Sequence, residues 1–404
     1  MRASLETNDK FVPGSIRTKE RMLMIWTGIV AIAVLIVAYA NGANDNFKGV
    51  ATLIGSGTTD YRKALAWATA TTFAGSVAAF FLATRLVMTF AGKGLVPDCL
   101  ISNPAFLAAV ALGTGLTVLV AARFGIPIST THGLTGALVG AGFMAIGTQL
   151  GFNTLGKKFF MPLLVSPVLA IIFTASIYFV MHHSRMILGI TRKSCLCIGQ
   201  KVISLVQLGL ENGQTMTISE IKIPGVFVGN ESSCQAKAIE TYEGKFLGVN
   251  AQTILDSLHF LSAGAVSFAR GLNDTPKIVA LLIAAGAMGL QWNMFLVASV
   301  MAIGGKFGAR KVARTVSTRI TSMNHGQGFT ANLVTAILVI FASGWGMPVS
   351  TTHVSCGTLF GIGLVNGTAN GKVISSILGA WFLTLPIAAI LSAGSFFVLS
   401  RIGG

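Results

Sequence analysis

Hydrophobic residues occur along this chain in long runs that short polar stretches separate. The runs at 22–40, 104–122, 159–181 and 374–399 contain no Asp, Glu, Lys or Arg. Each is about 20 residues long, which is the length of a helix that crosses a lipid bilayer. Together with further apolar segments, the pattern predicts an all-α polytopic membrane protein with about twelve membrane segments.

A polar middle divides the apolar runs into two groups. We predict a polar N-terminal tail at 1–21, a first membrane repeat at 22–183, a soluble β-rich insert at 184–252 and a second membrane repeat at 253–404. The insert contains alternating β-branched residues and the turn signal Asn212-Gly213, both typical of strands. A disordered linker is the alternative interpretation of the insert.

The two membrane parts resemble each other in sequence. Residues 39–57 match 268–286, and residues 124–143 match 345–364, with about half of the positions identical in each block. Repeated spans with matching interruptions are typical of secondary transporters, whose sites lie at the repeat interface near mid-membrane. We therefore predict two inverted repeats. Short segments at 47–57 and 277–286 are expected to be broken or re-entrant half-helices.

The composition supports a membrane location and gives no sign of a nucleic-acid partner. Of 404 residues, 53% are hydrophobic and only 10% are charged. The net charge of +16 comes mostly from basic stretches between apolar runs, at 17–21, 185–201 and 306–319. This is the excess of Lys and Arg that cytoplasmic loops of membrane proteins carry.

An Asn-Asp pair lies in an apolar setting at equivalent positions of both repeats, as Asn44-Asp45 and Asn273-Asp274. A charge at the bilayer centre costs about 3 kcal/mol, so such a carboxylate is expected to face a cavity or a cation. Carboxylate and amide oxygens suit a hard cation, here sodium. Capping of a short helix is the alternative role for each pair.

A lysine follows three residues after each aspartate, as Lys48 and Lys277. Each ammonium group can neutralise the neighbouring carboxylate or touch an anion. Extension of the side chain toward the membrane surface is the alternative interpretation.

A second motif, Pro-x-Ser-Thr-Thr-His, also occurs once in each repeat. The residue before proline disfavours helix, and Ser or Thr favours a helix start, so each motif is expected to open a membrane helix. Unpaired N–H groups and hydroxyls at such a start attract an anion. Capping without a ligand is the alternative. The candidate anion-binding residues are Ser129, Thr130, Thr131, Ser350, Thr351 and Thr352, with His132 and His353 as supporting hydrogen-bonding residues.

The motifs "GANDN", "GLNDT" and both "P-[IV]-S-T-T-H" blocks resemble those of the inorganic phosphate transporter family, the PiT or Pho-4 type. The resemblance covers both membrane repeats and leaves out the tail and the insert. It implies a sodium- or proton-coupled phosphate importer with inverted repeats. The sequence departs from the family at Asn46-Phe47-Lys48, where many members carry small apolar residues and an Ala-Asn pair.

We therefore predict import of inorganic phosphate in symport with sodium by alternating access. Protonated phosphate, unlike sulfate, has a hydroxyl that can donate a hydrogen bond to Asp45 or Asp274. Both aspartates are therefore candidate phosphate contacts as well as cation ligands. Proton coupling, sulfate as substrate, an anion channel and a cation antiporter are the alternatives.

An enzyme is not expected, because no nucleophile elbow is present and each polar group comes as a pair. No cofactor is expected apart from sodium as the coupling ion. The expected partners are phosphate, sodium or protons, the lipid bilayer of the plasma membrane, and a second copy of the chain in a homodimer.

Overall fold

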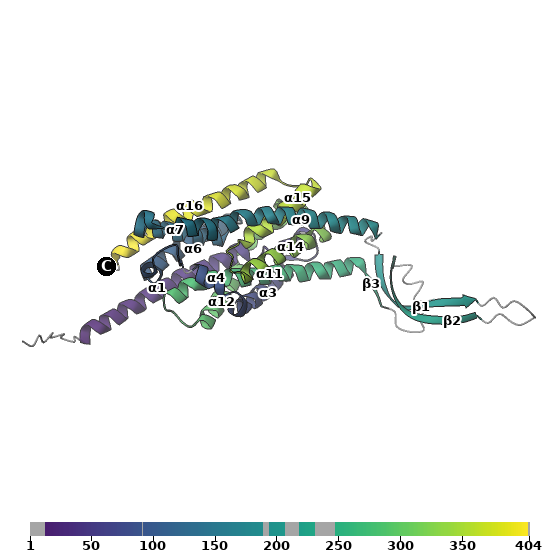
Figure 1. The fold of residues 1–404 in the computed structure, drawn as a ribbon, viewed down its shortest axis with the longest axis horizontal. Helices are drawn as coiled ribbons and strands as arrows, with labels where there is room; N and C mark the ends of the chain where they lie inside the picture. The colour runs from purple at the N-terminus through teal and green to yellow at the C-terminus, as the bar shows by residue number, and fades with distance from the viewer. Residues whose placement is uncertain (1–12, 91, 189–193, 207–217, 231–246, 403–404) are drawn as a thin grey trace, which may run out of the picture.

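A computed structural model of the chain describes residues 13–90, 92–188, 194–206, 218–230 and 247–402 (Figure 1). The helices before the insert are α1 (Pro13–Asp45), α2 (Ala51–Gly55), α3 (Tyr61–Leu82), α4 (Thr84–Phe90), α5 (Asp98–Ile101), α6 (Pro104–Phe124), α7 (Thr130–Ile146), α8 (Phe152–Thr154) and α9 (Met161–Ile187). Those after it are α11 (Ala251–Ala284), α12 (Leu290–Gly308), α13 (Arg310–Arg314), α14 (His325–Gly344), α15 (Thr351–Asn366) and α16 (Gly371–Ile402).

The long helices of the two halves correspond in order, and helices of one half pack against helices of the other. Helix α1 packs against α6 of its own half and α12 of the other, whereas α11 packs against α14 and α3. Likewise α16 packs along α7, and α15 along α9. Figure 1 shows that α1 and α11 run in opposite directions, as do α9 and α16. Each half therefore completes the packing of the other.

Two helix crossings show why the packing between the two halves needs glycine. A Cβ on Gly42 of α1 would lie 2.0 Å from the Met301 carbonyl oxygen of α12, and a Cβ on Gly271 of α11 would lie 2.1 Å from the Thr72 carbonyl oxygen of α3. The two contacts are equivalent, because both partners are related by the 229-residue offset of the repeat. Glycine thus lets the backbones at both crossings touch directly.

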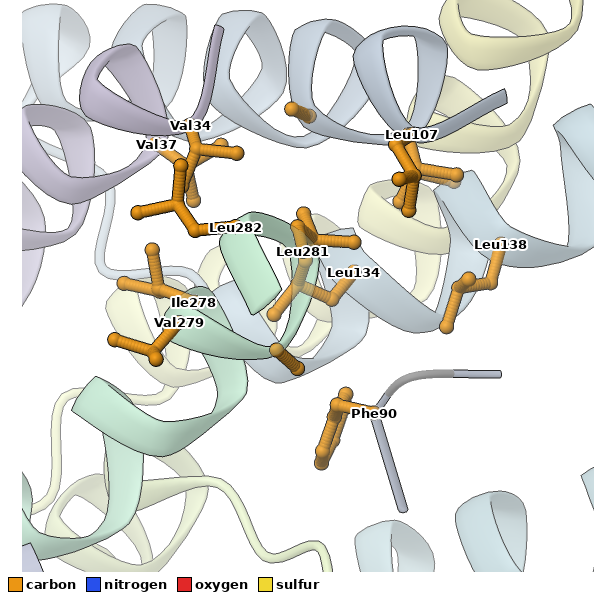
Figure 2. Packing of buried hydrophobic residues seen from close by; sticks show 14 of the residues in the cluster. Val34, Val37, Phe90, Leu107, Leu134, Leu138, Ile278, Val279, Leu281 and Leu282 are labelled. Atoms are coloured by element: carbon orange, nitrogen blue, oxygen red, sulfur yellow. The ribbon is translucent and has the colours of Figure 1, made fainter. Parts of the chain in front are cut away.

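A hydrophobic cluster lies between the two halves and fixes their contact (Figure 2). Val34 and Val37 from α1 pack near Ile278 and Leu282 from α11. The same cluster includes Leu107 of α6 and residues of α4 and α7. Residues far apart in sequence therefore share one core beside the C-terminal part of α11.

The outer surface of the helix bundle is apolar, as a lipid environment requires. Phe81, Phe382 and Ile390 are 74%, 80% and 71% exposed. Six helices among the described residues are long and apolar enough to span a membrane: Arg21–Asp45 of α1, α3, α6, Phe152–Ile187, α14 and α16. The chain is an all-helical multi-pass protein in its membrane part, as predicted. The total of about twelve segments stays a prediction.

The two expected half-helices differ in the structure. Helix α1 ends at Asp45, a turn covers residues 46–50, and the short α2 follows, so 47–57 is broken as predicted. The prediction for 277–286 is wrong, because α11 continues without a break from Ala251 to Ala284, past Pro276. Residues 278–282 are apolar and belong to the hydrophobic cluster, which stabilises the continuous helix.

Three strands lie within the predicted insert: β1 (Ser194–Val206), β2 (Ile218–Asn230) and β3 (Leu247–Asn250). They form an antiparallel sheet in the order β2-β1-β3, with Ser194 opposite Asn230. Figure 1 shows the sheet beyond the ends of α9 and α11, away from the helix bundle. Helix α9 continues to Ile187 and α11 begins at Ala251, so helices reach a few residues into the predicted insert range at both ends.

Candidate functional site

The C-terminal turns of α1 carry the first Asn-Asp pair. Asn41 and Asp45 lie on one face of the helix at a spacing of four, and the Asn41 amide donates to Asp45 Oδ2 at 3.0 Å. Asn44 lies on a neighbouring face, where its Nδ2 donates to the carbonyl oxygen of Ile126 at 3.0 Å. Its Oδ1 accepts from the backbone N–H of Ile128 at 3.2 Å. Asn44 therefore holds the loop that precedes α7.

The second pair lies in the middle of α11 and holds the equivalent loop before α15. Asn273 Nδ2 donates to the carbonyl oxygen of Val349 at 3.2 Å and to Asp274 Oδ1 at 3.0 Å. Asn273 Oδ1 accepts from the hydroxyl of Ser343 at 3.1 Å. The sequence predicted cation ligands at Asn44 and Asn273. In this structure both amides hold the chain before a helix start, and their role as cation ligands stays a prediction.

Helices α7 and α15 begin at the second motif, as predicted. Gly125 ends α6 with a left-handed φ of 74°, and Ser129 caps α7 by accepting from the His132 N–H at 3.1 Å. Ser350 caps α15 in the same way, with His353 N–H at 3.1 Å. The next backbone N–H groups, at the first positions of a helix, have no partner within the helix. Both helix starts thus present positive dipole ends.

The threonines after these caps link the two repeats. Lys48 of the first repeat donates to the Thr352 hydroxyl of the second, and Lys277 donates to the Thr131 hydroxyl of the first at 2.8 Å. The Thr352 hydroxyl donates to the carbonyl oxygen of Ile128 at 2.8 Å, and Thr131 to that of Val349 at 3.3 Å. These contacts are equivalent under the repeat, so the two motifs of each half meet those of the other.

Asn41 connects the two aspartates at the centre of the cluster. Its amide lies 3.0 Å from the Thr130 hydroxyl and 3.1 Å from Asp274 Oδ2, in addition to its contact with Asp45. The Thr130 hydroxyl donates to Asp45 Oδ2 at 3.2 Å. Thr351, at the equivalent position of α15, is buried as well. One continuous hydrogen-bonded group therefore contains both carboxylates and a hydroxyl from the start of α7.

Arg270 is a member of this group that the sequence analysis did not identify. Its Nη2 donates to Asn41 Oδ1 at 2.6 Å, and its Nε lies 3.8 Å from Asp274 Oδ2. Arg270 Nε has no hydrogen-bond partner among the described residues. The repeat itself carried the signal, because Asn41 and Arg270 occupy equivalent positions and open the two short motifs "NGAND" and "RGLND".

The cluster holds all of the buried strong charge in the described part of the chain. The buried Asp, Glu, Lys and Arg side chains there are Asp45, Lys48, Arg270, Asp274 and Lys277, and each is at most 3% exposed. Lys48 pairs with Asp45, and Lys277 lies 3.6 Å from Asp274 Oδ1. In their ordinary charge states these five groups sum to +1. Removing that much charge from solvent is costly, so an anion that completes the balance is favoured.

The two motif histidines lie beside the threonines and contact each other. Their ring centroids are 4.3 Å apart, and the His353 ring stacks on Trp381 at 3.9 Å. Trp381 in turn donates to the carbonyl oxygen of Pro127 at 3.0 Å, at the entrance to α7. No group of three or more His, Cys, Asp and Glu side chains that suits a metal ion occurs in the described ranges.

Ionisable groups buried among apolar helices, helix starts that face them and two interlocked halves define a multi-pass membrane transporter. The sequence comparison then identifies the family. The sequence model of the phosphate transporter family matches residues 41–392, so this chain belongs to that family. The membership confirms the resemblance seen in the motifs and confirms that the chain is a transporter and no enzyme.

Individual relatives agree over nearly the whole chain. A Pyrococcus abyssi protein with the name "Putative phosphate permease" is 28% identical over 406 residues, which cover 94% of this chain and 99% of that protein. Inorganic phosphate transporter 2-1, chloroplastic, of Arabidopsis thaliana is 25% identical over 440 residues, covering 94% and 74%. A solved structure titled "The sodium-dependent phosphate transporter" shares the fold, with a TM-score of 0.71 at 22% identity, covering 94% of this chain and 100% of that one.

Proposed function

We propose that this chain is a secondary transporter that imports inorganic phosphate by alternating access, coupled to a cation gradient. The observation that carries the proposal is that both Asn-Asp elements and both Ser-Thr-Thr-His helix starts lie in one cluster, together with the five strong charges that are buried in the described part of the chain. The family of the chain supports phosphate as the substrate.

The chemistry of the cluster suits protonated phosphate. The starts of α7 and α15, the hydroxyls of their threonines and the Arg270 guanidinium can donate to phosphate oxygens. Asp45 and Asp274 can accept a hydrogen bond from the hydroxyl of a phosphate monoanion. Sulfate has no such proton, so it would meet the carboxylates with an uncompensated repulsion. We therefore propose that the site prefers phosphate over sulfate.

The closed state of the cluster is the reason for proposing alternating access. Asn41, Asp45, Thr130, Arg270 and Asp274 are each at most 4% exposed, so a ligand reaches them only after the surrounding helices move. The opposite direction of equivalent helices supports inverted repeats, and one half that rocks against the other would open the cluster to each side in turn.

The coupling cation has two candidates. Sodium is the expectation from the sequence, and the oxygen atoms of Asn44, Asp45, Asn273 and Asp274 are suitable ligands for it. The proton is the second candidate, which is favoured by one observation: the Lys48 ammonium already contacts oxygens of Asn44 and Asp45. The plasma membrane as location and a homodimer as assembly stay predictions.

Uptake into vesicles tests the proposal. The purified chain is reconstituted into liposomes, and radiolabelled phosphate uptake is measured with an inward sodium gradient or an inward proton gradient imposed separately. We expect accumulation above the external concentration with at least one gradient, and no inhibition by a tenfold excess of sulfate. Uptake that follows only the phosphate gradient and the voltage would indicate an anion channel and overturn the proposal.

A further inference from the structure

The Lys48 ammonium group lies in a cage made of oxygen atoms. It contacts a carboxylate oxygen of Asp45, the hydroxyl of Thr352, the amide oxygen of Asn44 at 3.0 Å and the carbonyl oxygen of Ile128 at 3.0 Å. These four acceptors come from the end of α1, the loop before α7 and the start of α15. The side chain of Lys48 is buried, so the ammonium group is separated from solvent.

The Lys277 ammonium group lies in an equivalent cage. It donates to the carbonyl oxygen of Val349 at 2.7 Å and the hydroxyl of Thr131 at 2.8 Å, with Asp274 Oδ1 at 3.6 Å. The face of the Phe90 ring closes another side, 5.5 Å from the nitrogen. Each lysine therefore uses its own aspartate, a carbonyl of its own repeat and a hydroxyl of the other repeat.

Carboxylate, amide, carbonyl and hydroxyl oxygens are the ligands that hard metal cations take in proteins. Here an ammonium group, which is a compact charge with three N–H donors, occupies the centre of each set. A metal cation at the same oxygens would have to displace the ammonium group, or would lie against it and be repelled at close range.

We propose that Lys48 and Lys277 are the built-in cations of the site, and that phosphate binds to this protein without sodium. The inference rests on the proposed function, since it concerns the same phosphate site. The charge balance supports it: three cationic and two anionic side chains leave +1, which a phosphate monoanion neutralises. A bound sodium ion would raise the charge of the empty cluster to +2, in a region that solvent does not reach.

The first test compares salts. Phosphate binding to the purified full chain in detergent is measured by calorimetry in sodium chloride and in choline chloride at equal ionic strength. We expect dissociation constants within about twofold of each other, which is a difference of about 0.4 kcal/mol in binding free energy. A tenfold or greater loss of phosphate affinity in choline would overturn this inference, but it would not contradict the proposed function of phosphate transport. Absence of phosphate binding in both salts would instead overturn the proposed function.

The second test replaces the Lys48 ammonium group with the shorter amide of asparagine. In Lys48→Asn the short amide leaves the four oxygens around an open position, which sodium can fill. We expect this variant to bind phosphate with sodium present and to lose at least tenfold affinity in choline, so that sodium dependence appears where the native chain has none. Equal affinities of the variant in both salts would contradict the role of Lys48 as the substitute for a metal cation.

Two controls accompany the exchange. Lys63→Asn removes an exposed lysine whose ammonium group lies 3.8 Å from Asp60 Oδ2, and it should leave binding unchanged in both salts. The thermal unfolding temperature of Lys48→Asn, measured in each salt, reports whether the variant is folded. If it unfolds during purification, the Lys277→Asn variant provides the same comparison at the equivalent cage, and the salt comparison on the native chain remains decisive.

Discussion

The two Asn-Asp elements have nearly the same sequence, but their backbones differ. In the first, α1 ends at Asp45 and a turn leads into the short α2, whereas in the second α11 runs on through Asp274 to Ala284. Gly49 lies in the turn, where a Cβ would be 2.4 Å from the hydroxyl of Ser267 on α11. Its counterpart in the second repeat is Ile278, a core residue. A glycine destabilises a helix by about 1 kcal/mol, so the difference between Gly49 and Ile278 favours a helix break in the first repeat only.

The difference teaches which contacts the repeat preserves. The crossed contacts of Lys48 and Lys277 are equivalent although one lysine follows a helix end and the other lies within a helix. The contact between Asn41 and Arg270 is the asymmetric part, because an amide and a guanidinium occupy matching positions. The second repeat thus carries one positive charge, that of Arg270, which the first repeat lacks at the matching position. The predictions below separate the effects of the symmetric contacts from that of this asymmetric one.

The largest effect is expected at the asymmetric pair. Arg270→Met leaves Asp274 with less compensation in a closed site and should destabilise the protein by about 3–5 kcal/mol and abolish phosphate uptake. Asn41→Leu removes hydrogen bonds between an uncharged amide and charged side chains, and it should cost less, about 1.5–3 kcal/mol. Unfolding temperatures and vesicle uptake measure both. Arg62→Met, at an exposed position of α3, is the control, and equal losses in the two buried variants would contradict the asymmetry.

The two carboxylates should be functionally equivalent despite their different backbones. Asp45→Asn and Asp274→Asn each keep the side-chain shape but remove the charge, so each should abolish coupled uptake while the protein remains folded. Vesicle uptake and an unfolding profile of each variant provide the measurement. Full uptake in either one would show that its carboxylate is not needed for coupling.

The symmetric helix crossings should respond equally to a methyl group. Gly42→Ala and Gly271→Ala each place a Cβ about 2 Å from a carbonyl oxygen of the facing helix, and each should destabilise by about 1–3 kcal/mol. Gly28→Ala, where no atom lies within 4 Å, should be neutral or stabilise the helix by up to about 1 kcal/mol. Thermal unfolding compares the three. A loss at only one crossing would show that the halves are not equivalent there.

The smallest effect is expected at the start of α7. Ser129→Ala combined with Thr130→Ala removes the cap and the hydroxyl beside Asp45, and it should weaken phosphate binding about tenfold, or about 1.4 kcal/mol. The cation concentration for half-maximal uptake should change less. Ser395→Ala on the exposed face of α16 serves as the control. A larger change in cation dependence than in phosphate affinity would reverse the assigned roles.

Much of the site could be predicted from the sequence because each motif acts locally. Proline and glycine end α6 and α14, and Ser129 and Ser350 cap the following helices through contacts that span three residues. The unbroken course of α11 could not be predicted, since it depends on core packing of Ile278 and its neighbours against α1. The repeat marked the position of Arg270, but its contact could not be predicted, because it depends on the distant Asn41 lying within reach.

The amino-acid sequence by itself determined that the chain is a membrane protein, that it is duplicated and that it belongs with phosphate transporters, because run length, repetition and motif spacing are properties of the chain alone. Only the tertiary structure decided which half supplies the oxygens around each lysine, and that Asn41 connects both aspartates to Arg270. Those contacts join residues up to 304 positions apart in sequence, and only the packing of one half against the other brings such residues together.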